Sequence, residues 1–337
     1  MSHAKVLRRL SEDFGVGGAV VEWISSYLSD RSHYVKVADE ASVTVNVESG
    51  VPQGSVLGPL LFVACVSPVD RLVQSYGVQH VSYADDLTLY VNLQGDASSV
   101  LTRLSECSLA VASWFMLNDL LLNPTKSEVV LVGTRRQQLT TSLASAVSVA
   151  GSAVTPSTKI KLLGVTVDSA LNFDQHVSDV CSTAFFHIRA LRHIRSQIDT
   201  PTANKIACSV IASRLDYCNA VLSGMSKHNF DRLQRVQNAA ARAVVNSHSR
   251  SSVSSILRDL HWLPVQYRVD YKIAMLTFKV LTTAQPAYLH SLLHVTRPAR
   301  TTRLLSSGTL LDVPFCKSVI SSRAFSCCAP TLSTVYT

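Results

Sequence analysis

The spacing of apolar residues changes near residue 174, and this change restricts the fold more than any other feature of the sequence. Ahead of it, short strand-like runs alternate with segments of helical spacing. The strand-like runs lie at 33–38, 43–48, 80–92, 122–134 and 159–173. Beyond it, helical spacing covers roughly 174–197, 201–222 and 228–246. The pattern predicts an α+β fold, in which a mixed core is followed by a helical C-terminal half.

The first part of the core has clear local signals. A helix is expected over residues 17–31, followed by a β-hairpin whose polar connection is 39–42. In "SGVPQGSVLGPLLFV" (49–63) a turn opens a helix, with Ser55 as the N-cap and Pro59 in the first turn.

Later segments are predicted in the same way. Asp96 is the expected cap of a helix over 96–117. Residues 122–134 predict a turn and then a buried strand, and the serine-rich stretch 135–158 predicts a polar connection. The C-terminal part predicts one helix near 267–283 and irregular structure after it.

The composition limits the class of protein. Hydrophobic residues make up 47% of the 337 residues and charged residues only 16%, against about 25% charged in typical soluble domains. No stretch supplies the roughly 20 apolar residues of a spanning helix, and the start lacks a secretory signal. We therefore expect no membrane partner and a cytoplasmic or nuclear protein. Its eight cysteines lack a C-x-x-C pair and are expected to be free, buried thiols.

Positive charge is concentrated in one segment. Residues 186–250 hold ten Lys or Arg and three Asp, a net charge of +7 out of +8 for the whole chain. Such a segment indicates a polyanionic partner, with nucleic acid first and an anionic membrane surface second. A solvated helical face is the alternative.

Two adjacent acids stand out in "HVSYADDLTLYVN" (80–92). Asp85 and Asp86 would point to opposite faces of a straight strand, but at the tip of a hairpin both can approach one point. Neighbouring carboxylates repel each other unless a cation lies between them, and Mg²⁺ prefers such oxygen ligands. The pair is either a divalent-metal site or an exposed turn, in which Asp is common.

The surrounding motifs favour the metal site. Tyr83-Ala84-Asp85-Asp86 resembles the Y-x-D-D box of reverse transcriptases, and residues 49–62 are similar to the loop and helix that precede that box. The combination resembles the non-LTR (LINE-type) retrotransposon branch. "LNPTKSEVVLVGT" resembles the family's lysine-bearing segment and "KLLGVTVDSALNF" its primer-gripping hairpin. "SRLDYCNAVLSG", "LQRVQNAAARAV" and "LHWLPVQYRVDYK" resemble its thumb and downstream region.

The resemblance implies a fold and a division of the chain. The fold would be an incomplete polymerase right hand, with a palm sheet and remnant fingers followed by an α-helical, thumb-like region. Partial fingers and palm would occupy residues 1–174, a basic thumb-like domain 175–250, and a mixed region 251–337.

The resemblance also implies the catalytic chemistry. Asp85 and Asp86 would bind Mg²⁺ or Mn²⁺, with Asp85 the surer ligand. Two metal ions would assist attack of the primer 3′-hydroxyl on a deoxynucleotide, with RNA as the template and DNA as the primer. Lys126 would protonate or steady the departing pyrophosphate, although a solvated lysine after a turn is the alternative.

Further residues are assigned to the nucleic acid on the same basis. Those that would border the nucleotide, the template or the primer are Pro52, Gln53, Gly54, Tyr83, Leu163 and Gly164. Those that would contact phosphates without reading sequence are Arg189, Arg192, Arg195, Arg232 and Arg235.

One expected ligand is absent from the sequence. The family's site takes a further aspartate from an earlier palm strand, and "MSHAKVLRRL" resembles the stretch that follows this aspartate. The resemblance therefore implies fingers, palm and endonuclease segments upstream of Met1. We expect little or no polymerase activity from the chain alone, because two carboxylates hold a metal less firmly. A non-catalytic nucleic-acid-binding protein and a relic without a role remain the alternatives.

Overall fold

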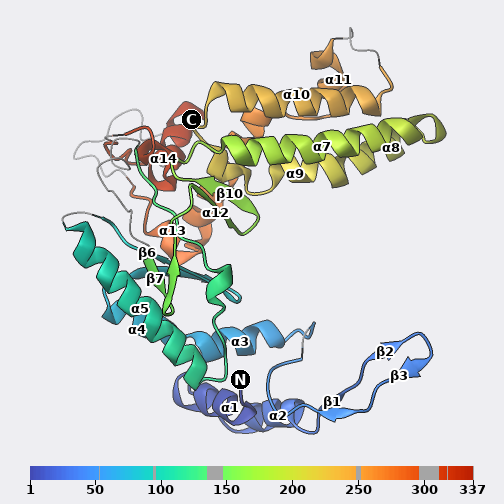
Figure 1. Cartoon of the computed structure of the whole chain (residues 1–337). Coiled ribbons are helices and arrows are strands. Elements are labelled where there is room, and N and C mark those ends of the chain that lie inside the picture. The colour runs from blue at the N-terminus through green and yellow to red at the C-terminus, as the bar shows by residue number, and fades with distance from the viewer. Residues whose placement is uncertain are drawn as a thin grey trace. The chain divides into compact units, whose positions relative to one another are not determined.

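The computed structural model describes residues 1–52, 54–93, 96–134, 147–247, 252–295, 311–316 and 318–336. These residues form helices and small two-stranded antiparallel sheets, which agrees with the predicted α+β class (Figure 1). The chain divides into two compact units. Unit 1 is Met1–Leu131 with Arg136–Ser157, and unit 2 is Val132–Arg135 with Thr158–Thr337. The polymerase right hand and the three-part division stay predictions.

Three helices build the first core of unit 1. They are α1 (His3–Glu12), α2 (Ala19–Leu28) and α3 (Gly58–Val66). Their apolar side chains meet in a cluster that includes Val6, Leu10, Ile24, Leu28 and Leu61. The helix predicted over 17–31 is confirmed as α2, although only Ile24 and Leu28 of its apolar residues are buried.

The predicted hairpin after α2 forms, with a tighter turn than expected. Strand β1 (Ser32–His33) pairs with β4 (Val45–Asn46), and β2 (Lys36–Val37) pairs with β3 (Glu40–Ala41). Of the predicted connection 39–42, Glu40 and Ala41 therefore belong to a strand. All of these strand residues are exposed, so the alternating pattern of this segment does not mark a buried face.

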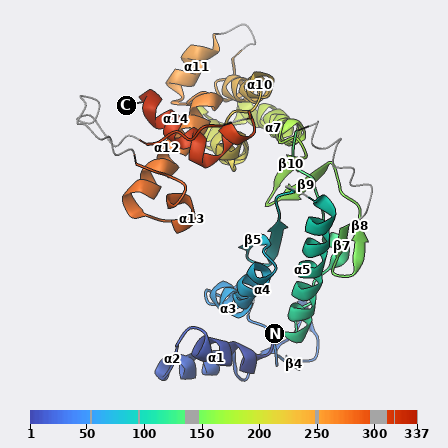
Figure 2. The same cartoon turned by 90° about the vertical axis from the view of Figure 1, so that its left-hand side faces the viewer.

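A second core of unit 1 supports the acidic hairpin. It joins α4 (Pro68–Ser75), β5 (Gln79–Tyr83), β6 (Asp86–Tyr90) and α5 (Ala97–Leu117). Figure 2 shows β5 beside α4. The predicted cap of α5 is confirmed, because the Asp96 carboxylate accepts hydrogen bonds from the amides of Ser98 and Ser99 at 3.1 and 3.2 Å.

One helix, α5, bears on the prediction that no segment is apolar enough to span a membrane, and a single such helix is weak evidence of a span. By length and composition, α5 is the one helix among the described residues that could cross a membrane. Its apolar stripe, which includes Val100, Cys107 and Val111, is buried in this structure. The helix packs on α4 and on β7 (Val147–Val149).

The segment after α5 departs from both predictions made for it. Among the described residues of 122–134 there is a 3-10 turn, η1 (Pro124–Lys126), and a single bridge from Val130 to Ser157. The predicted buried strand is wrong, because one bridge does not build a ladder. The polar connection is wrong for its second half, where β7 pairs with β8 (Ser152–Val154). Residues 135–146 lie outside the described residues.

Unit 2 begins with the predicted hairpin and continues in helices. Strand β9 (Lys159–Leu162) pairs with β10 (Val165–Asp168). The helical regions predicted at 174–197, 201–222 and 228–246 are confirmed in the elements that follow. These are α7 (Asp174–Ile194), η2 (Arg195–Gln197), α8 (Thr200–Ala207), a π-helical turn η3 (Cys208–Ala212), α9 (Ser213–Asp216), η4 (Asn219–Leu222) and α10 (Lys227–Val244).

Helices α7 and α10 lie side by side and run in the same direction (Figure 1). At one end the Asn229 amide donates to the Asp174 carboxylate at 2.7 Å. At the other end Arg195 Nε donates to the Val244 carbonyl at 2.8 Å. The core of unit 2 lies between these helices and their neighbours, and includes Ile188.

The C-terminal part is more helical than its sequence suggests. The predicted helix near 267–283 is α12 (Val265–Thr283), and it is preceded by α11 (Val253–Asp259). After it come α13 (Ala287–His290), η6 (Ser321–Arg323) and α14 (Phe325–Tyr336). Irregular structure was therefore the wrong prediction for α14. All eight cysteines are free thiols, but Cys208 and Cys218 are exposed rather than buried.

Candidate active site

The two aspartates lie at the tip of a two-residue β-hairpin. Strands β5 and β6 are antiparallel, and Tyr83 lies opposite Asp86 in the last pair of the ladder. Ala84 and Asp85 form the turn, and Ala84 has a positive φ of 54°. Tight hairpin turns need such a conformation because it matches the twist of the strands. The reversal places Asp85 in the turn and Asp86 at the start of the return strand.

Both carboxylate residues face one small hollow in unit 1. Asp85 and Asp86 line it together with Phe62 and Val66 of α3 and Phe115 of α5. The remaining lining residues are Val69, Ser82, Ala84 and Leu87. Both aspartates are exposed to solvent. The two exposed aspartates thus border one hollow whose other lining residues are mostly apolar.

The loop before α3 is held by a serine hydroxyl. Ser55 Oγ donates to the Pro52 carbonyl at 2.7 Å and accepts from the Gly58 amide at 3.0 Å. Ser55 was predicted as the N-cap, but the cap position is Leu57, so this prediction is wrong by two residues. Pro59 lies in the first turn as predicted.

Gly54 has a conformational reason to be glycine. Its φ is +80°, a region that L side chains rarely adopt, and nothing lies within 4 Å of the position of a Cβ. The space beside Gly54 is therefore open in this structure. Gln53, which was predicted to border the nucleotide, lies outside the described residues.

A histidine–aspartate contact fixes the hairpin to the preceding helix. His80 Nε2 of β5 lies 2.7 Å from Asp70 Oδ1 of α4. The His80 side chain is only 13% exposed, whereas that of Asp70 is 52% exposed. Leu87 and Leu89 of β6 pack against the same core as α4. These contacts hold the strands that carry Tyr83 and Asp86.

Tyr83 and Lys126 are both available to solvent. Tyr83 is 65% exposed. Lys126 is exposed in the η1 turn, which the Asn123 side chain caps by accepting from the Thr125 amide at 3.1 Å. Lys126 does not line the hollow that holds the two aspartates.

Three curated proteins of Drosophila melanogaster are similar to this chain. The probable RNA-directed DNA polymerase from transposon BS is 24% identical over 255 residues, which cover 73% of this chain and 28% of that protein. The probable RNA-directed DNA polymerase from transposon X-element is 26% identical over 248 residues, or 70% of this chain and 26% of that protein. The RNA-directed DNA polymerase from mobile element jockey is 25% identical over 246 residues, which cover 70% of this chain and 26% of that protein.

A protein family also matches the part of the chain that carries the acidic hairpin. Residues 2–167 match the family described as reverse transcriptase (RNA-dependent DNA polymerase). This segment is a reverse transcriptase domain. With the relatives above, it confirms the predicted kinship with non-LTR retrotransposon reverse transcriptases. The chain spans little more than a quarter of the length of these relatives.

The donors at the hairpin tip suit a divalent metal ion, which reverse transcriptases use. Carboxylate oxygens are the ligands that hard cations prefer, and Mg²⁺ is commonly held by one or two carboxylates with water and substrate phosphates. Asp85 and Asp86 meet this requirement. Across the described ranges no group of three or more His, Cys, Asp or Glu side chains is placed to hold a metal. The hairpin tip thus carries two carboxylate side chains of the kind that such a cation prefers.

Unit 2 holds the hairpin that resembles the primer grip. Leu163 and Gly164 form its turn, with φ values of +46° and +82°. The Tyr217 hydroxyl donates to the Leu163 carbonyl at 2.7 Å, and its ring lies 3.4 Å from where a Gly164 Cβ would be. A residue with a side chain at Gly164 would therefore be strained by the positive φ, and its Cβ would lie in van der Waals contact with the Tyr217 ring. Sequence reasoning missed Tyr217.

A buried histidine holds the second strand of this hairpin. The Thr166 amide donates to His176 Nδ1 of α7 at 3.4 Å. Burial lowers the pKa of His176, and the nearby Asp179 opposes this only in part. The neutral ring is the form that can accept the Thr166 hydrogen bond.

The five arginines proposed for phosphate contact differ in their availability. Arg189, Arg192 and Arg235 are exposed. Arg195 donates to the carbonyls of Val244 and Ile198 and to the Thr200 hydroxyl, so its guanidinium is engaged by groups of the same chain. Arg232 donates to Ser178 Oγ at 2.7 Å and to Asn229 at 3.2 Å. The last two side chains link helices of unit 2.

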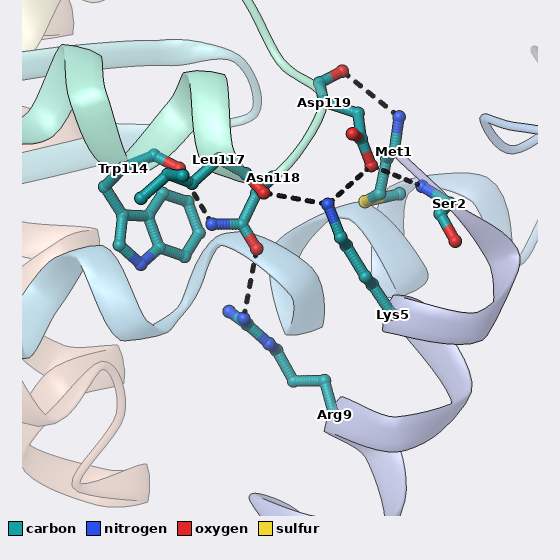
Figure 3. Close-up of polar contacts among 8 residues, drawn as sticks. All are labelled: Met1, Ser2, Lys5, Arg9, Trp114, Leu117, Asn118 and Asp119. Carbon is teal, nitrogen blue, oxygen red and sulfur yellow. Dashed lines mark hydrogen bonds and ion pairs between the residues drawn. The ribbon is translucent and has the colours of Figure 1, made fainter.

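A polar cluster in the reverse transcriptase domain joins α1 to the C-terminus of α5 (Figure 3). Lys5 Nζ donates to the Leu117 carbonyl at 2.8 Å and to Asp119 Oδ2 at 2.9 Å. Asp119 also accepts from the Ser2 amide at 3.2 Å. A cation at the last turn of a helix offsets the partial negative charge of its free carbonyls.

Arg9 completes this cluster (Figure 3). Its guanidinium donates to the Cys65 carbonyl at 2.7 Å and to Asn118 Oδ1 at 3.3 Å. Its Cζ atom lies 5.2 Å from the centre of the Trp114 ring, within cation–π range. Arg9 thereby connects α1, α3 and α5, and the last two of these helices also line the hollow beside the acidic hairpin.

Proposed function

We propose that Asp85 and Asp86 hold a divalent cation, Mg²⁺ or Mn²⁺, where a deoxynucleotide is joined to a DNA primer on an RNA template. The observation that carries the proposal is the turn at Ala84, which places Asp85 and Asp86 among the residues that line one hollow of a reverse transcriptase domain. When bound, the cation would offset phosphate charge and favour ionisation of the primer 3′-hydroxyl.

The neighbouring residues position the substrates in this proposal. Tyr83, exposed beside the carboxylates, supports the primer terminus. The backbone of Pro52, Gln53 and Gly54 borders the nucleotide and the template, and the open space beside Gly54 supports this role. The Lys126 ammonium, which is solvent-accessible, steadies or protonates the departing pyrophosphate.

Unit 2 supplies the contacts to the duplex. The turn at Leu163 and Gly164 holds the primer strand, and Tyr217 keeps that turn in place. Exposed Arg189, Arg192 and Arg235 bind phosphates, and such contacts fix a duplex without reading its sequence. We assign Arg195 and Arg232 a positioning role, because their guanidinium groups are engaged within the protein.

We further propose that the chain alone extends primers poorly. Two carboxylates leave most of the cation's ligands to water and phosphate, so metal and substrate must bind together to complete the site. A weakly held cation lowers the fraction of competent complexes.

A second candidate function is nucleic-acid binding without catalysis. Its support is the charge of residues 158–337, which hold 21 Lys or Arg against nine Asp and no Glu, a net charge of +12. Counterion release from a polyanion then favours binding whether or not a metal ion is held.

One experiment separates these functions. The chain is tested for extension of a labelled DNA primer on an RNA template with Mg²⁺ or Mn²⁺, and for binding of the same duplex. The control for Asp85→Asn is Asp39→Asn, because Asp39 also follows an alanine with a φ of 54° in an exposed hairpin turn. We expect salt-dependent binding by all variants and slow extension that Asp85→Asn alone abolishes.

Each result is decisive for one part of the account. Fast extension that Asp85→Asn abolishes would support the site and overturn the claim of poor activity. Extension that survives Asp85→Asn would overturn the site. Binding with no extension under any condition would support the second candidate.

A further inference from the structure

Helix α12 of unit 2 has an apolar face that no described residue covers. One side of the helix is buried and carries Val265, Val269, Ile273, Thr277 and Val280. This side packs on α14, η4 and α10. The exposed large side chains are Tyr267, Tyr271, Met275 and Phe278, with exposed fractions of 53%, 64%, 39% and 70%.

These exposed residues form one stripe. At 100° per residue, Tyr267, Tyr271 and Phe278 lie within a narrow arc opposite the buried side. With a rise of about 1.5 Å per residue, Tyr271 lies roughly 6 Å from Tyr267 and roughly 10 Å from Phe278 along the axis. Three flat rings are thus presented in a row to solvent.

One edge of the stripe is basic. Lys272 follows Tyr271 and Lys279 follows Phe278, so the two ammonium groups flank the rings from the same side, seven residues apart. Neither lysine has an ion pair in the described part of the chain. Arg268 lies on this edge too, but it is paired with Asp216. The one acid of α12, Asp270, lies on the opposite edge.

We propose that this face binds a single strand of nucleic acid. Bases would stack on Tyr267, Tyr271 and Phe278, and phosphates would lie along Lys272 and Lys279. Aromatic platforms beside cationic groups are how proteins bind single strands without sequence preference. Residues 158–337 carry a net charge of +12. This charge favours a polyanionic partner such as nucleic acid over a protein surface that has few acidic residues. The inference deepens the second candidate function, nucleic-acid binding without catalysis, on which it rests, and it requires neither Asp85 nor Asp86.

Fluorescence anisotropy with a short labelled oligouridylate tests the proposal on the full chain. Alanine in place of Tyr271 or Phe278 is expected to weaken binding roughly 5- to 150-fold each, whereas Tyr271→Phe keeps the affinity. Lys272→Ala and Lys279→Ala should each reduce the slope of log K against log salt by about 0.7. Tyr34→Ala, at a 59% exposed tyrosine of unit 1, is the matched control.

The outcomes discriminate between partners. If the Tyr271→Ala and Phe278→Ala variants bind oligouridylate as tightly as the wild-type chain does, the proposal is overturned. The proposal would also be overturned if the wild-type chain self-associates in sedimentation and these two variants do not, while their affinity for oligouridylate is unchanged. The face would then be a contact between copies of the chain. Asp85→Asn should keep its affinity for oligouridylate while losing extension, which separates this inference from the proposed polymerase site. Unchanged melting temperatures show that the variants are folded.

Discussion

At the scale of single residues, Asp119 shows how a surface carboxylate can hold two helices. It adopts a left-handed conformation, with φ of +59°, just after α5 ends. Its hydrogen bond with Lys5 is the largest cause that lowers its pKa, assisted by the charge of Lys5 and by the Ser2 amide. The ionised form is therefore favoured in the folded state.

Lys5→Met should remove this effect. With a lowered pKa, Asp119 stabilises the fold at pH values above the ordinary Asp pKa of about 3.9, and this contribution disappears as the pH falls through the lowered value. In Lys5→Met the Asp119 pKa should rise, and the free energy of unfolding should fall at pH 7 but change little at pH 2. NMR titration and urea unfolding measure both. Arg8→Met, whose partner Glu12 is exposed, is the control, and an unshifted Asp119 pKa in Lys5→Met would contradict the account.

The residues predicted from the sequence are those whose partners lie nearby in the chain. Asp96 caps amides two and three residues ahead, and the turn at Asp85 is set by its immediate neighbours. Lys5 and Asp119 are 114 residues apart, and Tyr217 and Leu163 are 54 apart. No local pattern indicates such contacts, because only the packing of distant elements creates them.

At the scale of elements, α7 depends on the apolar face that it turns toward α10. Ile188 is fully buried there, whereas Ile194 near the end of the same helix is 37% exposed. The two residues have the same side chain and differ in environment. They therefore separate packing from helix propensity.

Ile188→Ala should lower the free energy of unfolding by about 2–5 kcal/mol, because it leaves a cavity in a packed core. Ile194→Ala should lower it by less than about 1 kcal/mol. Chemical denaturation followed by circular dichroism measures both. Equal losses would show that α7 is not packed as described.

His176 gives the contact between β10 and α7 a pH dependence. Because burial lowers its pKa, the folded protein resists protonation while the unfolded chain takes up a proton below about pH 6.5. The free energy of unfolding should therefore fall as the pH drops from 7 to 5. His176→Gln, which keeps an acceptor, should remove this slope, and His193→Gln at an exposed position of α7 is the control. An unchanged slope in His176→Gln would refute the assignment.

Elements were predicted well where periodicity is long and poorly where a partner is needed. The long helices α5, α7, α10 and α12 follow from their apolar spacing. The strand expected in 122–134 does not form, because the described backbone of this segment pairs with Ser157 through a single isolated bridge and has no strand beside it. A strand is defined by its neighbour, which local sequence does not contain.

At the scale of the whole molecule, charge divides between the two parts of the sequence. Residues 1–157 hold ten Lys or Arg against 14 Asp or Glu, a net charge of −4, whereas residues 158–337 carry +12. The acidic part carries the proposed cation site and the basic part the proposed nucleic-acid contacts. This division is legible in the sequence, although the pairing of individual charges is not.

The central claim is that Asp85 and Asp86 together bind a divalent cation at the hairpin tip. Mn²⁺ binding followed by electron paramagnetic resonance tests it without requiring catalysis. The account predicts a site in the wild-type chain whose affinity falls at least about tenfold in Asp85→Asn and in Asp86→Asn, and is unchanged in Asp39→Asn. If both Asp85→Asn and Asp86→Asn bind Mn²⁺ as tightly as the wild-type chain does, the central claim is contradicted.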